Sequence, residues 1–366
     1  MRYALLMLGK FFRFKDIFFY LKKIIDFIFY KYLSIAPPIK LQIELASFCN
    51  LKCSFCVLSE IKREKKLMPL DDFKKIIDES GARYIQLSGV GETFLHPDCI
   101  EMLKYAKSKT QFVKVTTNGL VITEEMAKGI VDSGLDMLDV SIDTTDENLY
   151  KEIRGAKLEK VLGNIKTVFN YRNQKKSNLK IRAKNVYNEK NIYNLPKDIE
   201  KLDSLPFDEA LFLWIADLYE GSTHSTVKKE YIGVLNEAID VAKKIRRPDL
   251  VKNVKILIDI VWTKSVPVEK RVCYEPLYAP YITVDGDLIP CCTSAMWVLQ
   301  NEKNMLQMTM GNVIKNHFME VWKSVHAINV RKKVLAERQN FALCKDCLFD
   351  ENYFLKFVYK IAKQIN

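Results

Sequence analysis

The stretch LQIELASFCNLKCSFC, residues 41–56, decides the fold class of this chain. It begins with a short β-rich run and continues directly into a loop that carries Cys49, Cys53 and Cys56. Three thiolates from one loop can converge on a single metal cluster, but a closed structural zinc site needs four ligands. No histidine lies nearby, so the spacing favours a 4Fe-4S cluster with one iron open to a small molecule.

After this stretch, β-rich runs alternate with helical runs as far as about residue 247. This alternation predicts repeated βα units around a parallel sheet. Six units predict an α/β fold, a partial (β/α)6 TIM-like barrel, whose chemistry lies in the loops after the strands. The predicted strands are 41–45, 84–88, 113–117, 137–142, 179–187 and 210–215, and the predicted helices are 70–79, 97–107, 124–133, 159–171, 191–202 and 228–245.

Composition limits the alternatives. The chain has 366 residues, and its 13 glycines, 11 prolines and 28% charged residues exclude a collagenous or low-complexity protein. Its nine cysteines are odd in number and clustered, which does not fit a disulfide framework. Metal chemistry in a reducing cytoplasm is therefore expected. The formal net charge is +12, but the basic residues outside the N-terminal segment are interleaved with acids, so nucleic acid is not an expected partner.

Half of that excess charge lies in residues 1–40, and most of this half lies in the N-terminal segment, residues 1–36. Within it, residues 16–31 predict an amphipathic helix rich in Phe, Ile and Lys. Two interpretations stay open: the helix lies on the inner face of an anionic membrane, or it packs its apolar stripe on the protein. No secretory cleavage site and no uncharged run of about 18 residues occurs there.

The cysteine spacing C-x-x-x-C-x-x-C, with Phe55 before the last cysteine, resembles the signature of the radical S-adenosylmethionine superfamily. The resemblance implies a 4Fe-4S cluster on the three cysteines that binds S-adenosyl-L-methionine at its open iron. It implies reductive cleavage of that molecule to a 5′-deoxyadenosyl radical, which abstracts a hydrogen atom from the substrate. It also implies an electron donor such as flavodoxin or ferredoxin.

Three further motifs follow predicted strands. Residues 88–93, SGVGET, are similar to the family's G-G-E-P loop, which binds the methionine amino group, with Thr93 in place of proline. Residues 116–119, TTNG, and residues 141–143, SID, followed by Arg154, look like positions that hold the ribose and the methionine carboxylate. Tight turns and loop capping are the alternatives, as is a surface position for Arg154. The resemblance thus implies cofactor contacts from Phe55, Gly91, Glu92, Thr93, Asn118, Ser141, Asp143 and Arg154.

A second set of cysteines flanks a predicted hairpin, YITVDGDLIP at residues 281–290: one precedes it and four follow it. This region resembles SPASM and twitch domains, and its five cysteines fit the twitch form with one auxiliary 4Fe-4S cluster. The alternative is a structural zinc site with four cysteine ligands. Cys291 is preferred to Cys292 because it gives the twitch spacing, and Cys99 is expected to be a packed thiol. The implied ligands are Cys273, Cys291, Cys344 and Cys347.

The expected organisation has five parts: residues 1–36, a basic amphipathic helix; 37–247, the core barrel; 248–272, a linker; 273–350, a small α+β SPASM/twitch domain; and 351–366, a C-terminal helix. The expected function is a net oxidation of a carbohydrate or lipid-linked small molecule. The alternatives are a peptide or protein maturase and a non-enzymatic zinc-binding scaffold.

Overall fold

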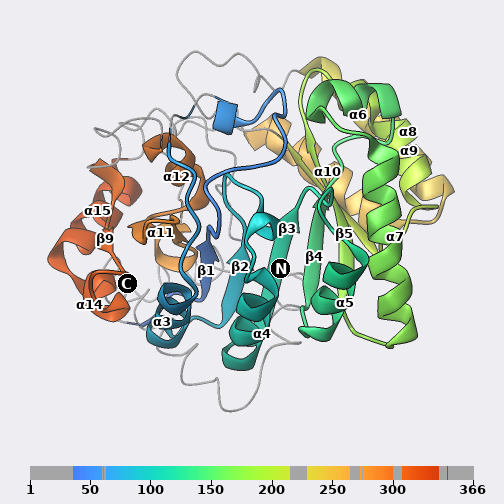
Figure 1. Cartoon of the computed structure of the whole chain (residues 1–366). Helices are drawn as coiled ribbons and strands as arrows, with labels where there is room; N and C mark the ends of the chain where they lie inside the picture. The colour runs from blue at the N-terminus through green and yellow to red at the C-terminus, as the bar shows by residue number, and fades with distance from the viewer. Residues whose placement is uncertain are drawn as a thin grey trace, which may run out of the picture.

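The computed structural model describes residues 36–59, 61, 63–214, 229–263, 273, 275–299, 307–337 and 344. The predicted helices in 1–36 and 351–366, and Cys347, lie outside the described residues. The described part begins with repeated strand and helix units, which follow one another around the molecule (Figure 1).

One sheet runs through this part of the chain, in the order β6-β5-β4-β3-β2-β1-β7-β8-β9. Strands β1 to β6 are parallel and the sheet does not close, so the predicted partial barrel is confirmed. Each of these six strands starts and ends within two residues of its predicted range. Their bounds are β1 Lys40–Ile43, β2 Tyr84–Leu87, β3 Phe112–Thr117, β4 Met137–Ser141, β5 Lys180–Tyr187 and β6 Glu209–Trp214.

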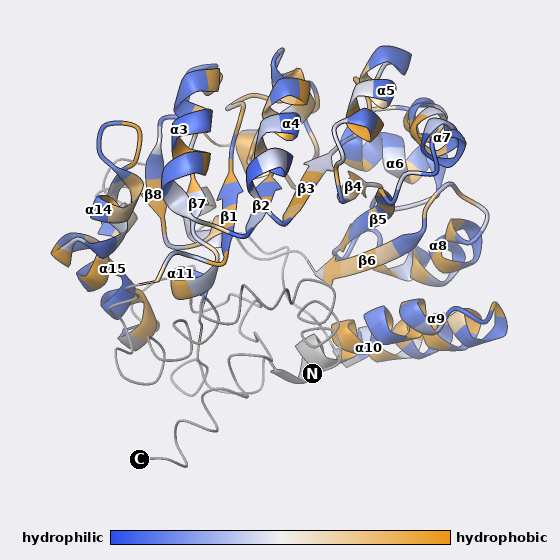
Figure 2. Cartoon of the chain, turned by 90° about the horizontal axis from the view of Figure 1, so that it is seen from below, coloured by the Kyte–Doolittle hydropathy of each residue, from blue (hydrophilic) through white to orange (hydrophobic). Residues whose placement is uncertain are grey.

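Helices cover one side of the curved sheet, as the view in Figure 2 shows. Six of them correspond to predicted helices: α3 Leu70–Ser80, α4 Cys99–Lys109, α5 Glu124–Asp132, α7 Leu158–Gln174, α8 Leu195–Leu202 and α9 Ile232–Lys244. A further short helix, α6 Glu147–Arg154, was not predicted. It begins where the Asp146 side chain accepts a hydrogen bond from the Leu149 amide, and it ends at Gly155 with φ +70°.

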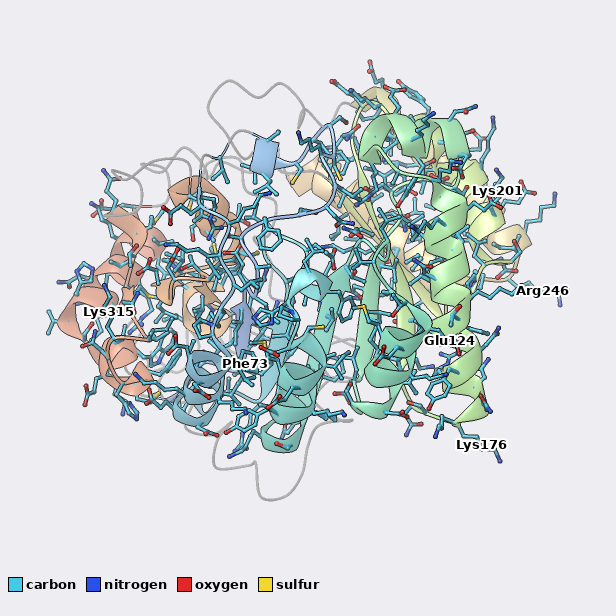
Figure 3. The ribbon with its side chains drawn as sticks, in the orientation of Figure 1. Phe73, Glu124, Lys176, Lys201, Arg246 and Lys315 are labelled. Carbon is cyan, nitrogen blue, oxygen red and sulfur yellow. The ribbon has the colours of Figure 1, made fainter. Side chains whose placement is uncertain are left out.

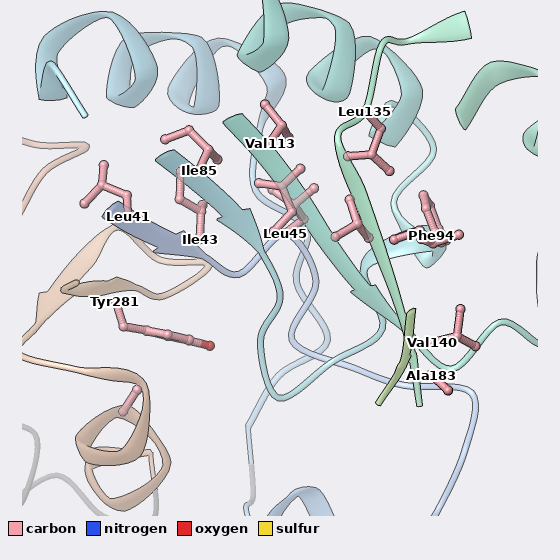
Figure 4. Packing of buried hydrophobic residues seen from close by; sticks show 14 of the residues in the cluster. Leu41, Ile43, Leu45, Ile85, Phe94, Val113, Leu135, Val140, Ala183 and Tyr281 are labelled. Carbon is pink, nitrogen blue, oxygen red and sulfur yellow. The ribbon is translucent and has the colours of Figure 1, made fainter. Parts of the chain in front are cut away.

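The two faces of the sheet differ in polarity. Leu41, Ile43, Ile85 and Val113 are fully buried on the face that meets helices α3 and α4 (Figure 4). Burying each such side chain contributes about 1.5–3 kcal/mol. Tyr281 projects from the opposite face (Figure 4). Because side chains alternate along a strand, the intervening residues face the inside of the barrel, and many of them are polar.

The first part of the range predicted as a linker, residues 248–272, is a helix in the structure. This helix, α10 Pro248–Thr263, packs against α9 and β6. Leu250, Val254 and Leu257 are buried at helical spacing, and Asn253 Nδ2 donates to the Ala210 carbonyl of β6 at 2.9 Å. The first part of this range therefore belongs to the barrel, because its apolar stripe covers the last parallel strand.

The predicted hairpin forms between β7 Tyr281–Ile282 and β8 Asp287–Ile289, with Gly286 at φ +85° in the turn. It does not start a separate sheet: β7 pairs in parallel with β1, and β8 pairs with β9 Gly311–Asn312. Since β1 would otherwise expose an unpaired edge, the hairpin satisfies its backbone groups. The remaining helices are α11 Glu275–Tyr278, α12 Cys292–Val298, α14 Phe318–Lys323 and α15 Val325–Ala336.

Charged side chains such as Lys176, Arg246 and Lys315 project from the periphery of the molecule (Figure 3). Among the residues that the structure describes, no helix is long and apolar enough to cross a membrane.

Candidate active site

The cysteine loop leaves β1 and is fixed by contacts on both sides. Ser47 Oγ accepts a hydrogen bond from the Lys66 amide at 2.7 Å. The Phe48 carbonyl accepts from the Glu92 amide at 2.9 Å, and the Ser54 amide donates to the Ile153 carbonyl of α6 at 2.8 Å. The loop is therefore held against the loop after β2 and against the helix after β4.

The three thiols of this loop are partly exposed, and an N–H group points at each of them, which for Cys56 is the Leu58 amide. The Leu51 amide and Asn118 Nδ2 donate to Cys49 Sγ at 3.4 and 3.7 Å. Arg154 Nη1 donates to Cys53 Sγ at 3.8 Å. Burial raises the pKa of Cys53 to about 11, although the Arg154 charge opposes the shift. A neutral thiol is a weak acceptor, so these donors fit the deprotonated thiolates of a metal cluster.

Glu92 joins the loops after β2 and β3. Its Oε1 accepts from Thr117 Oγ1 at 2.7 Å and from the Phe94 amide at 3.1 Å, while Oε2 accepts from the Asn118 amide at 2.8 Å. The side chain is only 4% exposed, and burial raises its pKa. The sequence predicts a carboxylate that binds a ligand, and the structure adds that this carboxylate positions Asn118.

Gly91 permits the close approach of the two loops. A Cβ atom at this position would lie 2.1 Å from the Ala46 carbonyl oxygen and 2.5 Å from that of Phe48. Both are backbone atoms of the cysteine loop, which cannot move aside as a flexible side chain would. Glycine is therefore required here for steric reasons. Two residues further along the chain, Thr93 Oγ1 lies within hydrogen-bond distance of the carbonyl oxygens of Leu87 and Thr116, at 3.4 and 3.3 Å.

Arg154, the last residue of α6, forms a buried ion pair with Asp143, which lies between β4 and α6. Arg154 Nη2 and Nε lie 2.5 and 2.7 Å from Asp143 Oδ2, and Asp143 Oδ1 accepts from the Val186 amide at 2.8 Å. Arg154 is only 7% exposed and stands over the Phe55 ring at 5.9 Å, which contradicts the surface alternative. Asp143 has φ +63°, an uncommon conformation for a residue other than glycine.

The structure thus brings most predicted cofactor residues around the cysteine loop. Asn118 Nδ2 also donates to Asn50 Oδ1 at 2.8 Å, which fixes its side chain beside Cys49. Ser141 ends β4 and is partly exposed opposite Lys184 of β5.

In the second set of cysteines, Cys273, Cys291 and Cys344 are buried. Cys291 Sγ accepts from the Ser294 amide at 3.3 Å and lies 3.2 Å from Ser294 Oγ. Cys292 is partly exposed instead, so the adjacent thiols have different surroundings.

Cys99 is buried in α4. Within the described ranges, no group of three or more His, Cys, Asp or Glu side chains could hold a single metal ion. The thiolates of a four-iron cluster bind different iron atoms, so they need not approach one another as closely as the ligands of one ion do.

Sequence reasoning missed a second buried ion pair. Arg63 Nη1 and Nη2 donate to the two carboxylate oxygens of Glu44 at 3.0 and 2.9 Å. Glu44 also accepts from the Val90 amide at 3.1 Å and from the Val284 amide at 3.2 Å. It therefore connects the end of β1, the loop after β2 and the hairpin. The available signal was an acidic residue between the buried Ile43 and Leu45.

Comparisons with known proteins agree with this arrangement. Residues 43–179 match the model of the radical SAM superfamily, and residues 273–348 match that of an iron-sulfur cluster-binding domain, SPASM. The tungsten-containing aldehyde ferredoxin oxidoreductase cofactor-modifying protein of Pyrococcus furiosus is 25% identical over 331 residues, 84% of this chain and 86% of that protein. The probable GTP 3′,8-cyclase of Methanococcus maripaludis is 37% identical over 132 residues, 35% of this chain and 42% of that protein.

Among solved structures, Streptococcus suis SuiB bound to S-adenosylmethionine has a similar fold, with a TM-score of 0.62 at 17% identity. The match covers 88% of this chain and 74% of SuiB. The open parallel barrel and its cysteine loop define the class of protein. Proteins of this class hold an iron-sulfur cluster at the ends of the barrel strands. The chain belongs to the radical SAM superfamily and carries a C-terminal SPASM domain. These domains use 4Fe-4S clusters and S-adenosyl-L-methionine as cofactors.

Proposed function

We propose that this protein is an enzyme that cleaves S-adenosyl-L-methionine reductively and oxidises a small-molecule substrate. The carrying observation is the group of N–H donors from Leu51, Asn118 and Arg154 around the thiols of Cys49 and Cys53. When bound, the reduced cluster supplies the electron that yields methionine and a 5′-deoxyadenosyl radical, which abstracts a hydrogen atom from the substrate.

The chain's own residues bind and orient. Cys49, Cys53 and Cys56 would hold the catalytic 4Fe-4S cluster. Around it, Arg154 would bind the methionine carboxylate, since its Nη1 already points at Cys53 while Asp143 fixes the other side of the guanidinium. The remaining contacts proposed are Gly91, Glu92 and Thr93 to the amino group; Asn118, Ser141 and Asp143 to the ribose; and Phe55 as a packing surface.

In the SPASM domain, we infer that Cys273, Cys291, Cys344 and Cys347 hold one auxiliary 4Fe-4S cluster, as in a twitch domain. The hydrogen bonds from Ser294 to Cys291 Sγ support Cys291 over Cys292, because sulfur ligands of clusters commonly accept such bonds. This cluster would accept an electron from the substrate radical, which gives a net two-electron oxidation.

The substrate proposed is a carbohydrate or a lipid-linked small molecule. The names of two relatives support a non-peptide substrate, since one concerns a tungsten cofactor and the other GTP. The alternative is a peptide, because SuiB, which shares the fold, has been solved with its precursor peptide SuiA. Recovery of a crosslinked or oxidised peptide as the product would decide for the alternative.

The proposed partners are a flavodoxin or ferredoxin as electron donor and an anionic membrane surface for residues 1–36, with the protein on the cytoplasmic side. The support for membrane binding is the pattern of Lys, Phe and Ile in that segment. Deleting residues 1–34 should abolish sedimentation with vesicles that contain phosphatidylglycerol. Unchanged sedimentation would show that the segment does not anchor the protein.

The test of the reaction is anaerobic incubation of the reconstituted protein with dithionite and S-adenosylmethionine, followed by chromatography for 5′-deoxyadenosine. The parent protein should form it, and Cys53→Ala should form less than about 1% as much, because the cluster loses a ligand. Cys99→Ala is the matched control, since this thiol is buried in α4 and is not one of the proposed cluster ligands, and it should keep the activity. No product from the parent, or equal product from Cys53→Ala, would contradict the proposal.

A further inference from the structure

The inner face of the sheet carries a band of polar and charged side chains. On the strands β1 to β5, the residues that alternate with the buried apolar ones are Lys40, Gln42, Gln86, Lys114, Asp139, Arg182 and Lys184. Side chains in successive strands at the same level lie close enough to interact. The band is therefore one connected surface.

Its centre has more positive than negative charge. Lys114 Nζ lies 3.3 Å from Asp139 Oδ2, and Arg182 donates from Nε and Nη2 to the two oxygens of Asp139 at 2.8 and 2.9 Å. Burial alone would raise the pKa of Asp139, but these two cations hold it at about 2. One carboxylate thus faces two cations. Lys40 and Glu275, which lie near each other at the edge of the band, add one charge of each sign.

Lys184 adds a further cation next to this group. Burial lowers the pKa of its ammonium, and the Asp139 charge opposes that shift. Across the described ranges of the chain, the ammonium makes no hydrogen bond or ion pair. Holding an unpaired cation in such surroundings costs stability. A bound anion would offset that cost.

Two neighbouring polar atoms also lack partners. Gln86 Oε1 and Thr116 Oγ1 are buried and accept or donate no hydrogen bond within the residues that the structure describes. The other end of Gln86 is fixed, because its Nε2 donates to Ser88 Oγ at 2.8 Å. Thr116 lies on β3 directly opposite Asp139 of β4, and Gln86 lies on β2, the next strand of the sheet. Buried polar atoms are seldom left unpaired, so these atoms indicate a ligand.

The band adjoins the candidate active site. Lys184 is directly opposite Ser141 in the pairing of β4 with β5, and two residues further along β5 the Val186 amide donates to Asp143. An anionic group bound at Lys184 would therefore lie inside the barrel beside the residues proposed to hold S-adenosylmethionine.

We propose that Lys184 and Lys114, with Thr116 and Gln86, bind an anionic oxygen group of the substrate, a phosphate or a carboxylate. This inference deepens the proposed function and rests on it for the identity of the ligand as the substrate. The protonated amines supply the charge, the hydroxyl of Thr116 donates a hydrogen bond, and Gln86 Oε1 accepts one from a neighbouring substrate hydroxyl.

The test is isothermal titration calorimetry on the anaerobically reconstituted full chain with S-adenosylmethionine present. Inorganic pyrophosphate is the titrant in one arm and citrate in the other, which distinguishes a phosphate from a carboxylate. The parent should bind at least one of them saturably, and Lys184→Met should weaken that binding at least tenfold. The anion affinity of Lys184→Arg should stay within about threefold of the parent, because arginine keeps the positive charge. This variant tests the inference even if Lys184→Met folds poorly.

The matched control is Lys180→Met, an exposed residue at the start of the same strand and on the same face. It should change anion binding by less than twofold. No saturable binding by the parent, or equal weakening in Lys180→Met, would overturn the inference. An equal loss of S-adenosylmethionine affinity in Lys184→Met would assign the lysine to the cofactor site instead. If the parent forms no 5′-deoxyadenosine, the proposed function fails, while the calorimetry still reports on the anion site.

Discussion

Arg154 and Asp143 show how a single contact supports the candidate site. Arg154→Leu leaves the Asp143 carboxylate buried without its cation, which should lower the free energy of unfolding by about 3–5 kcal/mol. Urea unfolding measures this loss. The control is Arg247→Leu, whose ion pairs with Asp203 and Asp249 are partly exposed and should contribute less than about 1 kcal/mol. Similar losses in both variants would contradict a buried, structural role for Arg154.

Asp198 should make the free energy of unfolding depend on pH. Its carboxylate accepts hydrogen bonds from Thr144, Thr145 and Asn194, but burial raises its pKa to about 6. A raised carboxyl pKa stabilises the folded protein at low pH, and this stability is lost as the pH rises through about 6. Between pH 5 and 7.5 the loss should be about 1.4 kcal/mol.

Asp198→Asn removes this loss, because the amide does not ionise and its oxygen can still accept the same hydrogen bonds. The difference in unfolding free energy between parent and variant should therefore change by about 1.4 kcal/mol between pH 5 and 7.5. Urea unfolding at several pH values measures it. A difference that is independent of pH would show that Asp198 is already ionised at pH 5.

The sequence predicted the place of site residues that lie within a recognisable motif. It did not predict contacts between residues that are far apart in the sequence. Asn118 and Asp143 each follow a parallel strand, and the ends of parallel strands meet at one edge of the sheet. The sequence therefore predicted that these two residues lie near the cysteine loop. Glu44 contacts the Val284 amide because β7 pairs with β1, a register that no local pattern specifies. Lys184 was missed because its strand was recognised by its apolar residues alone.

At the scale of elements, the loop after β2 offers a matched pair of glycines. Gly91→Ala places a Cβ atom 2.1 Å from a backbone oxygen and should destabilise the protein by more than about 2 kcal/mol. Gly163→Ala lies inside α7, where a Cβ atom would meet nothing within 4 Å, and should stabilise it by about 0.5–1 kcal/mol. Urea midpoints measure both changes. Equal effects would mean that the cysteine loop can move away from Gly91.

Strand positions were predictable because each parallel strand is a short β-rich run between helices in which apolar residues recur at alternate positions, so its type and length show locally. Helix α10 and the place of the hairpin were not. Leu250, Val254 and Leu257 form a helical stripe, but whether such a stripe packs on a barrel or elsewhere depends on β6, which is remote in sequence. Likewise the turn at Gly286 predicts a hairpin, but not that its first strand extends the main sheet.

At the scale of the whole molecule, the pairing of β1 with β7 places both cysteine regions on one continuous sheet. The cysteine loop follows β1, while Cys291 follows β8, two strands further along the sheet. Because β8 runs antiparallel to β7 and β1, Cys291 lies at the opposite end of the strands from the cysteine loop. Loss of one cluster should still leave the other in place, because each has its own ligands.

The iron content of the reconstituted protein should therefore report on each cluster separately. The anaerobically reconstituted parent should hold about eight iron atoms per chain, and Cys53→Ala about four. Cys291→Ser should also lose about four, whereas the adjacent Cys292→Ser should keep about eight, since Ser294 donates to Cys291 Sγ and Cys292 has a different environment. Iron assay and Mössbauer spectroscopy measure this. If Cys292→Ser loses iron and Cys291→Ser does not, Cys292 is the cluster ligand. If the parent is colourless and binds zinc, it holds neither cluster, and the proposed reaction is wrong.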